Sequence, residues 1–135
     1  MTAFLIDTGV AIHARDGTDA VLDRLAAHSG AVLLSALSVV ELLRGAQRDP
    51  AFTALRTARL EILLRHIPVI PFDAEAAEAY GAIIAHCGWA RARDYDRMLA
   101  AQAIATASIL ATDNVGGFRD IPGLQLANWG PAAAG

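Results

Sequence analysis

Short runs rich in apolar residues alternate with longer amphipathic segments along the chain. The short runs end at polar or glycine-containing turns, which is typical of buried strands, and they cover residues 3–6, 31–34, 108–111 and 125–127. A fifth run, 69–70, lies between two prolines and predicts an edge strand. Apolar residues at helical spacing predict helices over residues 10–15, 20–28, 36–47, 51–66, 73–87 and 94–106.

Residues at the segment ends predict where several helices begin and end. Ser35 and Asp94 stand where an N-cap is expected, and Pro50 falls in the first turn of the fourth helix. Gly88 ends the helix that Asp73 opens. Strands of about four residues that alternate with longer helices predict an α/β fold, with a parallel sheet covered by helices. Ligands bind such folds at the carboxyl ends of the strands.

Composition narrows the class of protein. A chain of 135 residues and 14.2 kDa fits one domain, and we expect residues 1–130 to form it, with 131–135 as a short flexible tail. Hydrophobic residues at 55% and charged residues at 19% exclude a disordered protein. The single cysteine, Cys87, excludes a disulfide framework and a cysteine-based zinc cluster, and it suits a reducing cytoplasm.

The charge balance argues against a passive nucleic-acid coat protein. The formal net charge is −3, and all 11 basic residues are arginines. The chain shows neither a signal peptide nor an apolar run of the ~20 residues that span a bilayer, so we expect a cytoplasmic protein without a membrane partner.

Four carboxylates stand in or beside apolar segments: Asp7, Glu41, Asp96 and Asp113. A carboxylate in such a place costs several kcal/mol unless it is paired or binds a metal. Simpler explanations exist for each. Glu41 fits a solvated helix face with an ion pair to Arg44, Asp96 fits a helix start, and Asp7 and Asp113 fit turns or caps.

Four segments together resemble a known family, the PIN domain. They are Phe-Leu-Ile-Asp-Thr at 4–8, Ser-Val-Val-Glu-Leu-Leu-Arg-Gly at 38–45, Asp-Arg-Met-Leu-Ala-Ala-Gln-Ala at 96–103, and Leu-Ala-Thr-Asp-Asn at 110–114 with Phe118. They stand in the family's order over most of the chain, 3–129, and are most similar to the VapC-type toxins of bacterial toxin–antitoxin pairs. The resemblance implies a three-layer α/β/α sandwich with a mostly parallel central sheet.

The resemblance also implies an activity and a site. The expected activity is a magnesium-dependent ribonuclease, an endonuclease in which an acidic cluster holds a metal-activated water. Mn²⁺ is expected to substitute for Mg²⁺. Asp7, Glu41 and Asp96 match the family's three core acidic positions. For the fourth position we favour Asp113 over Asn114, which then supports the site together with Ser38 and Thr8. We expect Asp7 and Asp96 to contact the ion directly, and Glu41 and Asp113 to act through water or a second ion.

Two departures from the family's pattern concern the site. Gly9 stands where the family usually has Asn or Ser, and Gly117 where it commonly has an acidic residue before Phe118. Arg44, Arg91 and Arg93 are the main candidates for binding RNA phosphates, with Arg48 and Arg97 as further candidates. The expected partners are the RNA substrate, a cognate antitoxin and a second copy of the chain.

Two alternative functions stay open at this stage. One is a catalytically inactive PIN-like module that binds protein. The other is a dimeric aspartic protease, because the Asp-Thr-Gly sequence at 7–9 resembles the active-site loop of that all-β family. The helical segments speak against the protease.

Overall fold

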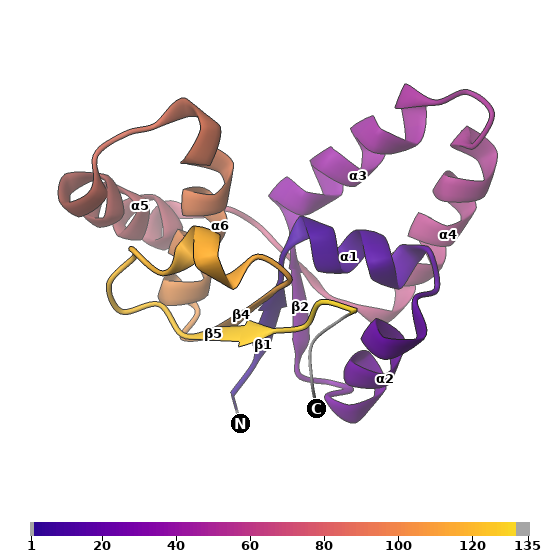
Figure 1. The fold of residues 1–135 in the computed structure, drawn as a ribbon, viewed down its shortest axis with the longest axis horizontal. Coiled ribbons are helices and arrows are strands. Elements are labelled where there is room, and N and C mark those ends of the chain that lie inside the picture. Colours follow the sequence, from indigo (N-terminus) through magenta and orange to yellow (C-terminus); the bar gives the residue numbers. More distant parts are fainter. Residues whose placement is uncertain (1, 132–135) are drawn as a thin grey trace.

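Parallel strands form the centre of the molecule (Figure 1). The computed structural model describes residues 2–131, so the predicted tail lies outside the described residues except for Pro131. Within that range the sheet has five strands: β1 (Phe4–Ile6), β2 (Val32–Ser35), β3 (Val69–Ile70), β4 (Ile109–Thr112) and β5 (Leu126–Asn128). Their order is β3-β2-β1-β4-β5, and each neighbouring pair is parallel.

The strand order places β1 in the middle and creates a switch point beside it. From β1 the chain proceeds outward through β2 to β3, then returns to the other side of β1 and proceeds through β4 to β5. Phe4 is therefore opposite Val32 on one side and Ile109 on the other. Ligands of open α/β sheets bind at such a reversal, outside the carboxyl ends of the strands.

Helices cover both faces of the sheet and make the three-layer α/β/α sandwich that the sequence predicted (Figure 1). They are α1 (Thr8–Arg15), α2 (Asp19–Ala27), α3 (Ala36–Arg48), α4 (Thr53–His66), α5 (Ala74–Cys87) and α6 (Asp94–Ala105), with short 3-10 helices η1 (Arg91–Arg93) and η2 (Val115–Phe118).

Adjacent strand residues serve two separate cores, because successive side chains of a strand point to opposite faces. In β1, Ile6 packs with residues of α1 to α4, whereas Leu5 packs with residues of α5 and α6. In β4, Ala111 and Leu110 divide in the same way. Both faces of the central strands are therefore dry, as is usual for parallel sheets.

Most predicted elements are present with ends shifted by one or two residues. Ser35 and Asp73 cap α3 and α5 by accepting hydrogen bonds from the backbone N–H groups of Leu37 (3.0 Å) and Ala76 (2.9 Å). Gly88 ends α5 with φ of 77°, a conformation that other residues rarely adopt.

Two local predictions were wrong, and two short elements were missed. Pro50 is not in the first turn of α4, because a turn closed by the Phe52 N–H on the Asp49 carbonyl delays the helix to Thr53. Asp94 is not an N-cap but the first residue of α6, and its carboxylate accepts from the Tyr80 hydroxyl instead. The 3-10 helices η1 and η2 are not among the elements that the sequence predicted.

No helix in the described part of the chain combines the length and apolar character needed to cross a membrane.

Two neighbouring leucines of α3 test the placement of the core. Leu42 is 1% exposed and Leu43 is 51% exposed. We expect Leu42→Ala to lower the free energy of unfolding by about 2–5 kcal/mol, because it leaves a cavity between the helix and the sheet. Leu43→Ala, the matched control, should change it by less than about 0.5 kcal/mol. Urea denaturation measures both, and equal losses would contradict the helix orientation.

Candidate active site

Asp7 follows the central strand and is held in place by two neighbouring elements. Its Oδ1 accepts a hydrogen bond from the Val10 N–H (2.8 Å), which makes Asp7 the N-cap of α1. Its Oδ2 accepts from the Thr112 hydroxyl at the end of β4. Because the residue is only 8% exposed and both carboxylate oxygens are engaged, the position of this carboxylate is fixed by β1, α1 and β4 together.

Burial raises the pKa of Asp7 from its ordinary 3.8 to about 6. The hydrogen bonds from Thr112 and Val10 oppose this change, and the negative charges of Asp113 and Asp96 add to it. The charge of Asp7 is therefore costly in the absence of a cation. Three of the predicted acidic residues lie near enough to act on one another electrostatically.

Glu41 reaches the same edge of the sheet from α3. The Thr8 hydroxyl donates to Glu41 Oε1 (2.7 Å) and is also hydrogen-bonded to Ser38 Oγ (2.9 Å). Ser38 is fully buried, and within residues 2–131 Glu41 forms no ion pair with Arg44. The predicted ion pair is therefore absent, although Glu41 stays partly exposed. Of the two predicted supporting residues, Thr8 touches Glu41 directly and Ser38 touches Thr8.

Asp96 completes the group from the first turn of α6. Burial raises its pKa, the Glu41 carboxylate raises it further, and Arg93 lowers it. Glu41 and Asp96 are thus close enough to repel each other. A helix start favours negative charge, which partly offsets this repulsion.

Asp113 lies where two glycines leave room for it. A Cβ atom at Gly9 would lie 3.0 Å from Asp113 Oδ1, and one at Gly130 would lie 2.8 Å from Asp113 Cβ. The first distance is tight and the second is not tolerated, so side chains at these positions would displace Asp113. Gly9 departs from the family's pattern, and the space that a side chain there would fill is occupied by the Asp113 carboxylate.

The side chain of Asn114 lies beside η2. Its backbone N–H donates to Thr112 Oγ1 (2.9 Å), and a Cβ atom at Gly117 would lie 2.6 Å from its Nδ2. The charge of Asp113, not Asn114, acts on Asp7. This geometry favours Asp113 as the fourth member, with Asn114 beside it.

His13 is a neighbour of the site that the sequence interpretation missed. Its Nε2 lies 3.7 Å from Asp113 Oδ2, and both side chains are about one third exposed. The available signal was spacing, because Gly9 and His13 are four residues apart on α1 and therefore share the face that meets Asp113.

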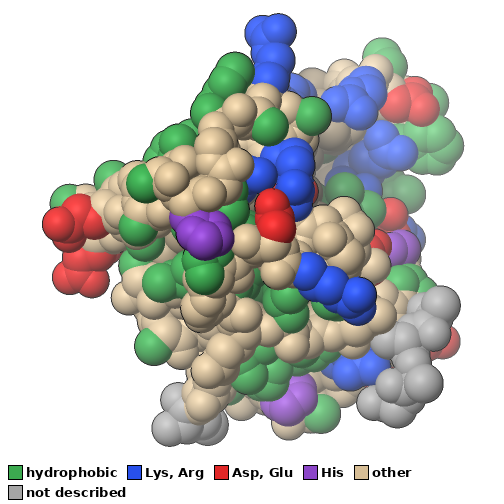
Figure 2. Space-filling model, turned by 60° about the vertical axis from the view of Figure 1, so that its left-hand side comes forward, with side chains coloured by type: hydrophobic (Ala, Val, Ile, Leu, Met, Phe, Trp, Pro, Cys, Tyr) green, Lys and Arg blue, Asp and Glu red, His purple; other side chains and the backbone are tan. Residues whose placement is uncertain are grey.

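The three predicted RNA-binding arginines lie on both sides of the acidic edge but differ in their contacts. Arg44 on α3 and Arg91 in η1 are exposed, and neither has an ion pair among residues 2–131. Arg93 instead pairs with Asp120 through both terminal nitrogens (3.0 and 2.8 Å). Its charge is largely balanced within the protein. Figure 2 shows arginine side chains on both sides of the recess on this face.

The acidic residues fit a magnesium ion by the chemistry of their donors. All four offer carboxylate oxygens, the ligands that Mg²⁺ prefers. Within residues 2–131 no three His, Cys, Asp or Glu side chains stand close enough to form a ready-made cage. Magnesium does not need one, since it keeps several waters and uses one or two direct carboxylates. The cost of charging Asp7 also fits a site that a cation would stabilise.

Comparisons with known proteins show the family and the fold of the chain. The family model described as PIN domain matches residues 4–124. The tRNA(fMet)-specific endonuclease VapC of Salmonella typhimurium is 25% identical over 132 residues, covering 96% of this chain and 99% of the relative. The crystal structure of DNA-bound VapBC from Salmonella typhimurium has a TM-score of 0.85 at 25% identity, covering 96% of this chain and all of that one. A toxin–antitoxin complex from Klebsiella pneumoniae has a TM-score of 0.75 at 21% identity, covering 95% and 98% of the two chains.

The raised pKa of Asp7 predicts an unusual dependence of stability on pH. Between about pH 4 and pH 6 the folded chain binds more protons than the unfolded chain, so without metal the free energy of unfolding falls as pH rises, by at most about 3 kcal/mol. Asp7→Asn should remove most of this fall. Chemical denaturation in a metal chelator at several pH values measures it, and a variant that kept the full slope would contradict the assignment to Asp7.

Proposed function

The chain belongs to the PIN domain family, and from that premise we propose that it is a metal-dependent endoribonuclease that acts as the toxin of a toxin–antitoxin pair in the cytoplasm. The observation that carries the proposal is the group of carboxylates at the carboxyl ends of β1 and β4. Asp7, Glu41, Asp96 and Asp113 come from four separate segments, yet they act on one another electrostatically. Like charges are gathered at such cost mainly where a cation or a reaction requires them.

Asp7 and Asp96 would hold Mg²⁺ directly, and Glu41 and Asp113 would act through water or at a second ion. When bound, the ion would activate a water and stabilise the charge of the phosphate during an in-line displacement. The chain's own contribution is rigidity. Val10 and Thr112 hold the Asp7 carboxylate, and Thr8 holds one oxygen of Glu41. The second oxygen of Glu41 has no hydrogen bond among residues 2–131 and can orient a water.

An acidic site repels RNA, so cations beside it must attract the substrate. Arg44 and Arg91 are placed for this, because they are exposed and lie on the segments that also carry Glu41 and lead to Asp96. We propose that they contact phosphates on the two sides of the scissile bond. Arg93 is paired with Asp120 and is not assigned a phosphate contact.

An apolar groove supports a protein partner. A cavity of about 400 Å³ lies between α2 and α4, and its lining includes Leu22, Leu25, Ile62 and Leu63. Leu22 and Ile62 are exposed in the isolated chain. An antitoxin segment with apolar side chains would cover this surface. Homodimer formation stays a prediction, in keeping with the exposed Val40 and Leu43 on α3.

The aspartic protease alternative is wrong. The Asp-Thr-Gly segment at 7–9 joins the central parallel strand to α1, whereas the protease family is all-β. The inactive module remains as the negative outcome of the experiments below.

Metal binding is the first test, because it needs no knowledge of the RNA target. Selective binding of Mg²⁺ or Mn²⁺ to the folded state should raise the melting temperature by several degrees at about 100 times the dissociation constant. Asp7→Asn should abolish the rise. Asp23→Asn, an exposed carboxylate on α2, is the matched control and should keep it. No rise in the wild-type chain would favour the inactive module.

Cleavage is the second test, with initiator tRNA as the first substrate because the Salmonella relative is named for it. We expect Mg²⁺-dependent cleavage that falls at least ~100-fold in Asp7→Asn and Asp96→Asn, since each removes a carboxylate that would hold the ion. Gel analysis of end-labelled RNA measures this. Undiminished cleavage by both variants would refute the assignment of the site.

A further inference from the structure

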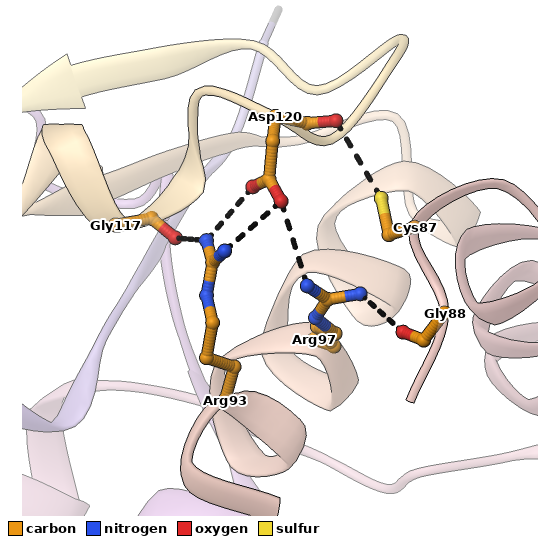
Figure 3. Close-up of polar contacts among 6 residues, drawn as sticks. All are labelled: Cys87, Gly88, Arg93, Arg97, Gly117 and Asp120. Carbon is orange, nitrogen blue, oxygen red and sulfur yellow. Dashed lines mark hydrogen bonds and ion pairs between the residues drawn. The ribbon is translucent and has the colours of Figure 1, made fainter. Parts of the chain in front are cut away.

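Asp120 is the centre of a group of ionic contacts outside the acidic site (Figure 3). It lies in the segment between η2 and β5. Its carboxylate accepts two hydrogen bonds from Arg93 (3.0 and 2.8 Å) and one from Arg97 (3.4 Å). The carbonyl oxygen of Asp120 also accepts a hydrogen bond from Cys87 Sγ (3.5 Å).

These contacts join the two segments that bring the last carboxylates to the site. Arg93 and Arg97 flank Asp96, one just before α6 and the other in its first turns. Arg93 also donates to the Gly117 carbonyl in η2, four residues after Asp113. The start of α6 and the segment that follows β4 are therefore held together through Asp120.

Arg97 is the buried member of this group, whereas the side chains of Arg93 and Asp120 are 38% and 43% exposed. The Arg97 side chain is 4% exposed, and its other hydrogen bond goes to the Gly88 carbonyl (2.6 Å). Its buried Nε has no partner within residues 2–131. Burial alone would raise the pKa of Asp120, but the hydrogen bonds and charge of Arg93, with the charge of Arg97, lower it overall. A buried guanidinium depends on its one carboxylate partner.

We propose that Asp120 is a positioning residue of the acidic site: through Arg93 and Arg97 it fixes the first turn of α6, with Asp96, against the segment that carries Asp113. This inference rests on the proposed function and adds a residue to it.

Gly117 belongs to the same group of contacts. At this position the chain has no acidic side chain, and only the carbonyl oxygen is available to Arg93. Asp120, three residues later, supplies the carboxylate that Arg93 contacts. The segment that lacks an acidic side chain at position 117 thus carries one at position 120.

The sharpest test is Arg93→Gln, because two explanations predict opposite signs. If Arg93 acted only as a positive charge near Asp96, it would repel Mn²⁺. Its removal would then strengthen Mn²⁺ binding. If Asp120 positions α6 through Arg93, the loss should weaken Mn²⁺ binding about tenfold to 100-fold, the range seen when groups that orient metal ligands are lost. Isothermal titration with Mn²⁺ measures this, and unchanged or tighter binding would overturn the proposal.

Variants of Asp120 provide the second measurement. Asp120→Asn should weaken Mn²⁺ binding by a similar factor and speed amide hydrogen exchange of residues 113–118, while Asp120→Glu should restore most of the affinity. Leu60→Ala, buried on the far side of the sheet, controls for lost stability and should keep its Mn²⁺ affinity below the unfolding transition. Normal exchange and affinity in Asp120→Asn would overturn the inference. If the wild-type chain bound no Mn²⁺, the proposed function would fail first, and the role of Asp120 would fail with it.

Discussion

The buried carboxylate of Asp7 is the constraint on which the site depends. It ends the central strand, begins α1 through the Val10 N–H and accepts from Thr112 at the end of β4. These contacts fix the one group that every other acidic side chain must approach. Burial also makes its charge costly, since its pKa rises to about 6. The rest of the edge serves to place partners near this group: Thr8 for Glu41, the start of α6 for Asp96, and the space at Gly9 for Asp113.

The same edge shows how a fold brings like charges together without disrupting itself. The cluster lies outside the carboxyl ends of parallel strands, where helices begin, and α1 and α6 start beside it. Their N-terminal dipoles and backbone N–H groups favour negative charge. Two hydrophobic cores, one on each face of the sheet, supply the stability that this arrangement consumes. Asp120 takes the ion pairs of Arg93 and Arg97, so none of the four carboxylates has an arginine ion pair among residues 2–131.

Much of this could be predicted from the sequence because strands, helices and strand ends leave local signals. The alternation of short and long segments gave the sheet and its covering helices, and Asp7, Glu41, Asp96 and Asp113 were identified as candidates from their apolar surroundings and the family's pattern. What failed depended on contacts between distant residues. The sequence alone could not show that Asp94 is not an N-cap, because this depends on its contact with Tyr80. Arg93 carries the same charge whether it faces RNA or Asp120, and His13 gains meaning only from its place opposite Asp113.

The central strand of the sheet comes from the beginning of the chain, and its neighbour β4 comes from near the end. The bond between Thr112 and Asp7 joins residues 105 positions apart. A nascent chain that still lacks β4 has neither the partner that holds Asp7 nor Asp113. The acidic site therefore assembles only in a chain in which both strands are present and paired. Separation of this one pair of strands would take the site apart as a unit.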